Sequence, residues 1–194
     1  MVKIYLAGPD VFLPDAMAHG RALQRLCADY GFVGIYPLDG ALPEPLTATP
    51  RSARHIYEAN IALLTGCNAV MANLQNFRGA EPDSGTAFEV GFAIARGLPV
   101  WGYGAPSQPI TAQVAADAEG RDGDGYHVED FGLSRNLMLA CSIQLVDGDV
   151  QACLAAMRSS FLLNNEATYA ATPAATPAAN AATCASNAHN ASSN

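Results

Sequence analysis

Short apolar runs alternate with longer amphipathic segments along the first 103 residues of this chain. Four runs have the length and the flanking Gly and Pro residues of buried strands, at 2–7, 32–36, 69–74 and 99–103. Between them, apolar residues recur at helical spacing in three segments, at about 16–30, 52–65 and 85–96. Strands that alternate with helices build parallel βαβ units. The pattern predicts an α/β fold with a doubly wound, mostly parallel sheet, in the three-layer arrangement of flavodoxin-like and Rossmann-like domains.

The second half of the chain has weaker patterns. Residues 104–130 are rich in glycine and aspartate and are expected to be mostly irregular, with a short helix at 110–118. A last helix is predicted over 148–163, with its apolar residues on one face. From residue 164 onward Ala, Thr, Asn, Ser and Pro dominate, a composition that cannot form a core. We therefore expect a single folded domain over 1–163 and a low-complexity, disordered tail over 164–194.

The composition narrows the range of partners. The chain has 194 residues, a formal net charge of −8 and only 10 Lys plus Arg, so nucleic acid and anionic membrane surfaces are poor partners. No apolar run reaches the ~18 residues of a membrane span, and the N-terminus lacks the apolar core of a signal peptide. The five cysteines are scattered, as expected for free thiols in a reducing cytoplasm. The four histidines lack metal-ligand spacing and no glycine-rich phosphate loop occurs, so we expect neither a metal nor a cofactor.

The polar stretch 78–91 concentrates the candidate chemistry. It contains Arg78, three carboxylates (Glu81, Asp83 and Glu89) and three glycines, and it joins the predicted strand 69–74 to the next helix. Open α/β sheets bind their ligands at the carboxyl ends of strands, where this stretch begins. For Arg78 the default interpretation is an ion pair with Glu81 or Asp83. The stretch is therefore the first place to look for an active site.

Two interpretations of Asp83 and Glu89 follow from their spacing of six residues. Two carboxylates that face one pocket suit glycosidic chemistry, with one as nucleophile at the anomeric carbon and the other protonating or hydrogen-bonding the leaving group. Small residues such as Gly85 would let a sugar approach Glu89. Alternatively, Asp83 caps the helix and Glu89 is a solvated helix residue, which the spacing alone favours.

Tyr5, in the middle of the first predicted strand, also has two interpretations. It is either a core tyrosine with a satisfied hydroxyl group or a hydrogen-bond donor to the Glu89 carboxylate. The second arrangement would orient the carboxylate and reduce its basicity.

With these residues in view, the chain resembles the nucleoside 2-deoxyribosyltransferase family. Four blocks carry the resemblance, in the order found in the family: Ile-Tyr-Leu-Ala-Gly-Pro-Asp-Val-Phe at 4–12, Tyr-Pro-Leu-Asp at 36–39, the stretch 68–91, and Asn-Leu-Met at 136–138. The stretch 68–91 is long and specific, whereas the other three are individually weak.

The resemblance implies an enzyme that transfers the 2-deoxyribosyl group between nucleobases of 2′-deoxynucleosides, with retention of configuration, in nucleoside salvage. Glu89 would be the nucleophile that forms a covalent deoxyribosyl-glutamate, Asp83 the acid or hydrogen-bonding residue, and Tyr5 the residue that orients Glu89. The expected substrate-binding residues are Gly8, Asp10, Phe12, Asp39, Asn60, Gly85, Asn136 and Met138.

Asn136 corresponds to a residue that a neighbouring subunit contributes to the sugar 5′-hydroxyl. The resemblance therefore implies a homo-oligomer, a dimer or a hexamer, with shared active sites.

The block 78–83 is also similar to the purine-active branch of the family. Phe12, Phe88 and Met138, covered by the proline-rich loop 40–50, would exclude water from the intermediate.

The sequence departs from the family at three asparagines, Asn60, Asn68 and Asn73, which stand where aspartates are common. An amide can hydrogen-bond a base but cannot act as its general acid, so Asp83 would carry that duty alone.

Two other functions stay open. One is an N-glycosidase that hydrolyses deoxynucleosides or their 5′-monophosphates, although Asp10 and the few basic residues favour free nucleosides. The other is a non-catalytic nucleotide-binding module.

Overall fold

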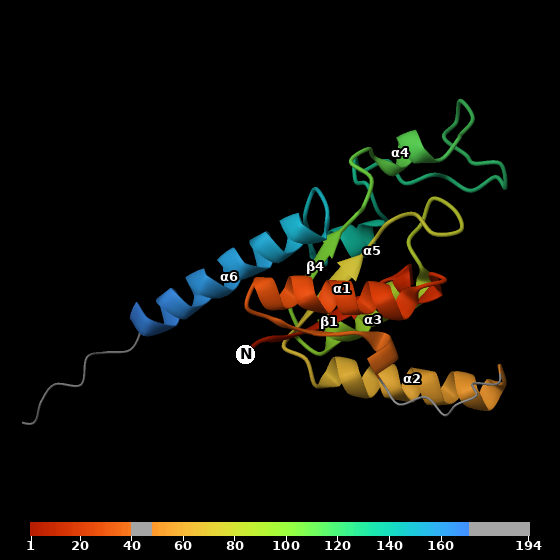
Figure 1. Ribbon diagram of the computed structural model, residues 1–194. Coiled ribbons are helices and arrows are strands. Elements are labelled where there is room, and N and C mark those ends of the chain that lie inside the picture. The colour runs from red at the N-terminus through yellow and green to blue at the C-terminus, as the bar shows by residue number, and fades with distance from the viewer. Residues whose placement is uncertain (40–47, 171–194) are drawn as a thin grey trace, which may run out of the picture.

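Five parallel strands form one sheet at the centre of the computed structural model (Figure 1). The backbone is described for residues 1–39 and 48–170, and the side chains of these ranges up to residue 163. The strands are β1 (Lys3–Ala7), β2 (Val33–Ile35), β3 (Ala69–Asn73), β4 (Val100–Tyr103) and β5 (Gln144–Leu145). Their order is β2-β1-β3-β4-β5, so the chain extends the sheet first on one side of β1 and then on the other. The predicted doubly wound α/β fold is confirmed.

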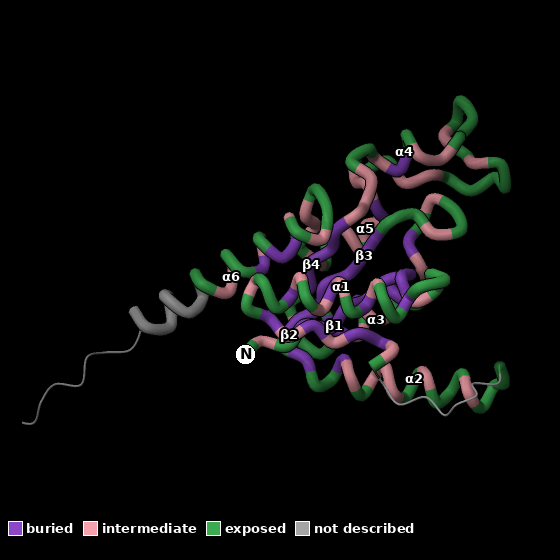
Figure 2. The backbone as a smooth tube through the Cα atoms, in the orientation of Figure 1, coloured by how far each residue is buried: buried purple, intermediate pink, exposed green. Residues whose placement is uncertain are grey.

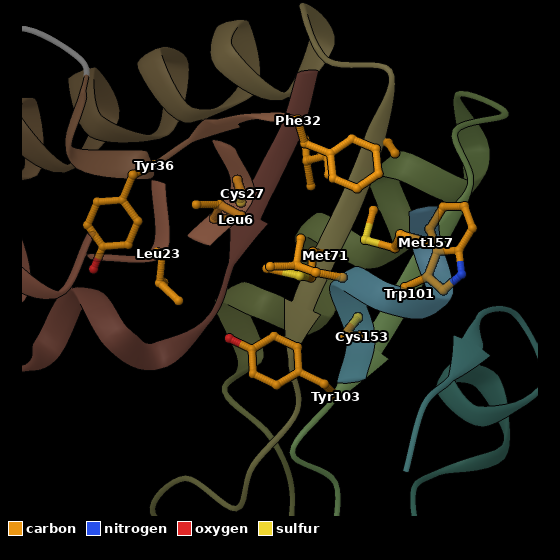
Figure 3. Close-up of a cluster of buried hydrophobic side chains, with 13 residues drawn as sticks. Leu6, Leu23, Cys27, Phe32, Tyr36, Met71, Trp101, Tyr103, Cys153 and Met157 are labelled. Atoms are coloured by element: carbon orange, nitrogen blue, oxygen red, sulfur yellow. The ribbon is translucent and has the colours of Figure 1, made fainter. Parts of the chain in front are cut away.

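Helices cover both faces of this sheet. On one face, α1 (Ala16–Asp29) and α6 (Val150–Ala170) pack over a cluster of apolar side chains that includes Leu23, Met71, Trp101 and Met157 (Figure 3). The opposite face carries α2 (Pro50–Thr65) and α3 (Ser84–Ala95), whose Leu64 and Val90 are fully buried. Figure 2 shows the buried strands between partly exposed helices. This is the three-layer arrangement that the alternating pattern predicted.

The alternation of side chains in β1 decides which face receives Tyr5. Successive residues of a strand point to opposite faces of a sheet. Ile4 and Leu6 join the cluster under α1 and α6, whereas Tyr5 and Ala7 join the cluster under α2 and α3. Tyr5 therefore points toward the layer that contains α3, the helix that carries Glu89.

The segment between β4 and α6 differs most from the prediction. Its helix α4 spans only Ile110–Gln113, because Val114 already adopts an extended conformation (φ −112°, ψ 125°). A single helical turn, α5 (Leu137–Ala140), and the short strand β5 complete the segment, and neither was predicted. Elements this short contain too few residues to display a helical or strand periodicity.

The bounds of the outer helices also differ from expectation. Helix α2 begins at Pro50, slightly before the predicted Ser52, because Thr49 caps it by accepting a hydrogen bond from Ser52 N (3.1 Å). Helix α6 runs to Ala170, beyond the predicted end at residue 163. Two 3-10 turns, Pro9–Phe12 after β1 and Pro37–Asp39 after β2, complete the elements.

Two predictions fall wholly or partly outside the described ranges. Residues 40–47, most of the loop predicted to cover the site, and residues 171–194, most of the predicted tail, are not described. No helix within the described ranges is both long and apolar enough to cross a lipid bilayer.

Candidate functional site

Tyr5 and Glu89 form the central contact of the candidate site. The hydroxyl group of Tyr5 donates a hydrogen bond of 2.5 Å to Glu89 Oε1, across 84 residues of sequence. Tyr5 is fully buried, while Glu89 lies in the second turn of α3 and keeps some exposure. The predicted contact is therefore present, and the interpretation of Glu89 as a freely solvated helix residue is wrong.

Burial controls the charge of this pair. Desolvation raises the pKa of Glu89 from 4.5 to about 7; the hydrogen bond from Tyr5 opposes this shift, and the nearby charge of Asp83 adds to it. Burial, followed by the charge of Glu89, also raises the pKa of Tyr5, which stays protonated as a donor. Glu89 is consequently a carboxyl group that changes its charge near neutral pH, a property typical of functional carboxylates.

Asp83 caps the helix that carries Glu89. Its Oδ2 accepts hydrogen bonds from Thr86 N (2.9 Å) and from the Thr86 hydroxyl group (3.1 Å). Among the described residues no donor is bonded to Oδ1, so one carboxylate oxygen stays available to a ligand. The capping role and a role in ligand binding are thus compatible, since they use different oxygens of the same group.

A second buried carboxylate, Asp10, lies where β1 and β3 end. Its oxygens accept hydrogen bonds of 3.1 and 3.2 Å from Nδ2 of Asn73, and Oδ1 lies 3.5 Å from Nε2 of His19. A Cβ atom on Gly8 would come within 2.6 Å of Asp10 Oδ2 and 2.9 Å of Asn73 Cβ, so only glycine fits there. The two hydrogen bonds from Asn73 hold the Asp10 carboxylate in place.

Aromatic rings and a cation gather on the loops beside these strand ends. The rings of Phe12 and Phe77 stack with their centroids 5.3 Å apart. The Arg78 guanidinium carbon lies 4.6 Å from the Phe77 centroid and 5.3 Å from that of Phe12. Arg78 forms no ion pair within the described ranges, so the predicted pair with Glu81 or Asp83 is wrong. Phe12 is 57% exposed, which makes this cluster a solvent-facing apolar surface.

Asn136 and Met138 lie on a separate surface. They line a groove of about 750 Å³ between α3 and α5, together with Pro82, Ala87, Ile94 and Leu139. Neither Tyr5 nor Glu89 lines this groove. Met138 is 71% exposed, and the Asn136 side chain caps α5 by accepting a hydrogen bond from Met138 N (3.0 Å). Within one subunit, therefore, no described hydrogen bond links Asn136 to Tyr5, Asp83 or Glu89.

The remaining predicted residues lie on three different elements. Asp39 closes the turn after β2, because its Oδ2 accepts hydrogen bonds from Tyr36 N and Gln24 Nε2, both of 2.7 Å. Asn60 lies on α2 and is half-buried. Gly85 is the second residue of α3, where a Cβ atom would lie 3.0 Å from Asp83 Oδ2. The substrate contacts assigned to these residues stay predictions.

Two residues that the sequence analysis did not single out hold the loops of the site. Arg135 is fully buried and donates hydrogen bonds to the carbonyl oxygens of Leu74 (2.6 and 2.9 Å) and Ala80 (2.9 Å). Glu129 accepts hydrogen bonds from Asn136 Nδ2 (2.6 Å) and Leu137 N (3.0 Å). Their only sequence signal was proximity to Asn136, since a charged residue in an irregular segment is ordinarily solvated.

The described residues contain no cluster of three or more His, Cys, Asp or Glu side chains suited to a metal ion. The donors and acceptors that gather at the strand ends are carboxylates, amides and one phenol. Such groups suit a polar, uncharged ligand with several hydroxyl and ring-nitrogen groups.

Comparison with known proteins agrees with the geometry. The family model described as nucleoside 2-deoxyribosyltransferase matches residues 4–138. The solved structure of a 2-deoxyribosyltransferase from Leishmania mexicana superimposes with a TM-score of 0.68 at 32% identity, covering 82% of this chain and 98% of that one.

Two further similarities are weaker. An uncharacterised protein of Schizosaccharomyces pombe is 28% identical over 167 residues, covering 76% of this chain and 79% of its own. A conserved protein of Enterococcus faecalis shares the fold with a TM-score of 0.51 at 18% identity, covering 84% of this chain and 99% of that one. The family match spans most of the folded part, from β1 to α5, and includes Tyr5, Asp83, Glu89 and Asn136. The chain belongs to the nucleoside 2-deoxyribosyltransferase family.

Proposed function

We propose that this protein transfers the 2-deoxyribosyl group of a 2′-deoxynucleoside to a second nucleobase, through a covalent ester on Glu89 and with retention of configuration. The observation that carries the proposal is the hydrogen bond from the buried Tyr5 hydroxyl group to Glu89 Oε1. It orients the carboxylate and leaves Oε2 to react. Membership of the family supports the same chemistry.

The first half of the reaction breaks the N-glycosidic bond. Glu89 Oε2 bonds to the anomeric carbon, and the electrons of the bond between that carbon and nitrogen pass to the departing base. Asp83, in its protonated form, passes the proton on its available Oδ1 to a nitrogen of the departing base, so that the base leaves neutral and Asp83 becomes ionised. Asn73 is occupied with Asp10, and its amide cannot supply a proton, so Asp83 is the acid that this proposal requires.

The second half returns the sugar to a base. A nitrogen of the incoming base bonds to the anomeric carbon, the ester bond to Glu89 breaks, and the proton of the base passes to Asp83. Two displacements at one carbon give net retention. Water in the site would convert transfer into hydrolysis, and the exposed Phe12–Phe77 stack is suited to cover the base and exclude water.

The active site in this proposal is shared between two subunits of a homodimer or of a hexamer built from dimers. Asn136 lines a largely apolar groove beside an exposed Met138, on a surface that excludes Tyr5 and Glu89 of the same chain. An isologous contact over this groove would deliver Asn136 to the partner's pocket, and the partner's Asn136 to this one. There the amide would bind the sugar 5′-hydroxyl.

The direct test of the proposed function is a transfer assay. Purified protein is incubated with 2′-deoxyadenosine and a panel of purine and pyrimidine acceptor bases, and the products are separated by chromatography. We expect new 2′-deoxynucleosides, with purines among the accepted bases, which would fit a role in nucleoside salvage. Free deoxyribose as the sole sugar product would indicate a hydrolase instead, and binding without turnover would indicate a nucleotide-binding module.

The pH dependence of the reaction tests the role of Tyr5. Because the charge of Glu89 changes around its pKa of about 7, the profile of kcat/KM against pH should have a midpoint near neutrality. In Tyr5→Phe the hydrogen bond that lowers the Glu89 pKa is lost, so the midpoint should move upward by about 1 pH unit. Rate profiles between pH 5 and 9 would reveal the shift. Tyr126→Phe, at an exposed tyrosine, is the matched control, and a midpoint that stays in place or falls in Tyr5→Phe contradicts the assignment.

A further inference from the structure

The amide of Asn136 is fixed at both of its ends. Its Oδ1 accepts a hydrogen bond from Met138 N (3.0 Å), while its Nδ2 donates one to Glu129 Oε1 (2.6 Å). The second oxygen of Glu129 accepts a hydrogen bond from Leu137 N (3.0 Å). Glu129 therefore holds the side chain of Asn136 and the backbone of Leu137 at the start of α5.

The chemistry of these groups determines which way the amide points. An ionised carboxylate can only accept hydrogen bonds, so Nδ2 of Asn136 must face Glu129. A backbone N–H can only donate, so Oδ1 must face Met138. One Nδ2 hydrogen is then left over, and its direction is set by the other two bonds. Without Glu129 the amide could rotate, and this hydrogen would lose its fixed direction.

Arg135 ties the same turn to the loop that leads to Asp83. Its guanidinium is fully buried, and within the described ranges it forms no ion pair with a carboxylate. The charge is instead compensated by the carbonyl oxygens of Leu74 and Ala80 and by Asn76 Oδ1 (2.5 Å). Breaking these bonds would leave a buried cation without partners, which is costly. They therefore hold the turn 134–138 firmly against the end of β3. The start of α5, which Glu129 holds, is thus fixed to the end of β3.

We propose that Glu129 is a positioning residue, which aims the remaining N–H of Asn136 at the 5′-hydroxyl of a deoxynucleoside bound in the partner subunit's pocket. This inference rests on the proposed function. Glu129 itself does not touch the substrate and acts only through Asn136. Its loss should therefore matter only for substrates that carry the group which Asn136 recognises.

The test compares two donors that differ in one hydroxyl group, 2′-deoxyadenosine and 2′,5′-dideoxyadenosine, in the transfer assay with the full-length protein. Glu129→Ala should lower kcat/KM for 2′-deoxyadenosine about tenfold, the effect of one lost hydrogen bond. The value for the 2′,5′-dideoxy donor should not change. Glu129→Gln, which keeps one acceptor oxygen, should recover part of the loss. Glu119→Ala is the matched control, since this glutamate lies in the same segment and pairs with Arg121.

A double substitution sharpens the comparison. If Glu129 acts through Asn136, adding Glu129→Ala to Asn136→Ala should cause no further loss. An additive loss, an equal loss on both donors, or no loss in Glu129→Ala would each overturn the inference. A wild-type protein that treats the two donors alike would overturn it as well, although transfer itself would stand. A wild-type protein without any transfer would overturn the proposed function together with the inference. Thermal melts show whether Glu129→Ala folds. If it does not, the two donors are compared with Glu129→Gln in its place.

Discussion

Replacing Glu89 with glutamine is expected to slow deoxyribosyl transfer by at least about 1,000-fold, because a neutral amide cannot form the glycosyl ester. Glutamine keeps the shape of the side chain and an oxygen that accepts the Tyr5 hydrogen bond, so substrate binding should persist. Initial rates of base exchange and the dissociation constant of a deoxynucleoside, measured on the same preparation, would separate the two effects. Glu58→Gln, at an exposed glutamate of α2, is the matched control and should retain full activity.

The same substitution should make the protein more stable above neutral pH. Below pH 4.5 Glu89 is protonated in both the folded and the unfolded chain; as the pH rises, the unfolded chain ionises first, since burial raises the folded pKa to about 7. The free energy of unfolding of the wild type therefore falls as the pH rises from about 4.5 to about 7, and Glu89→Gln avoids this fall. At pH 8 we expect a gain of roughly 2 kcal/mol in the free energy of unfolding. Urea titrations at pH 4 and pH 8 measure it, and a destabilised variant would point to a merely structural glutamate.

The covalent intermediate provides an independent check. A donor supplied without an acceptor should leave deoxyribose attached to the wild-type protein, on a peptide that contains Glu89. Peptide mass spectrometry after rapid acid quenching locates the attachment. Sugar attached to Asp83 or to another residue would refute the assignment of the nucleophile, whereas an unlabelled protein that still transfers would refute the covalent route.

Two variants with impaired active sites should complement each other when they share a dimer. In a mixed dimer of Glu89→Gln and Asn136→Ala, one pocket carries both substitutions and the other carries neither. Random mixing makes half of the dimers mixed, so co-expression should recover about a quarter of wild-type activity. Steady-state rates of the purified mixture, with two affinity tags to isolate mixed dimers, provide the measurement.

The recovery of activity in mixed dimers depends on which of the two subunits contributes Asn136 to each pocket. If Asn136 served the pocket of its own chain, the mixture would show only the average of the two variants. Asn136→Ala also removes the cap of α5, which costs about 1 kcal/mol, too little to unfold a domain of ordinary stability. Asn136→Ser keeps a capping side chain and separates the loss of the amide from the loss of the cap. A monomeric wild-type protein with full activity would exclude a shared site.

Local patterns in the sequence predicted the framework well. Apolar runs between glycines and prolines located β1 to β4, because a buried strand must be apolar over its whole length. The helical spacing before Gly31 and Gly97 located α1 and α3. The sequence offered the helix cap as one of two interpretations of Asp83, since capping is an interaction between residues close in sequence, and the structure shows that cap. Such features depend on neighbours within a few positions.

Other features escaped the sequence because their partners are distant along the chain. Arg135 contacts the end of β3, 61 residues away, and nothing in its neighbourhood distinguishes it from a surface arginine. The ion pair expected for Arg78 was wrong because the Phe12 ring, brought in from the loop after β1, offers the cation an alternative surface. The two-residue strand β5 exists only because β4 provides an edge for it.

The stretch 78–91 shows the division most clearly. The sequence by itself determined that Glu89 follows the start of a helix at the end of a strand, since apolar periodicity is a local property. It left the capped helix and the active site as competing interpretations. Only the tertiary structure decided that Glu89 is buried against Tyr5 and has a pKa near 7, because burial and charge depend on the pairing of β1 with β3 and on the packing of α3 over both. The helix cap and the candidate active site proved to be the same feature, with Asp83 serving the helix through one oxygen and keeping the other available.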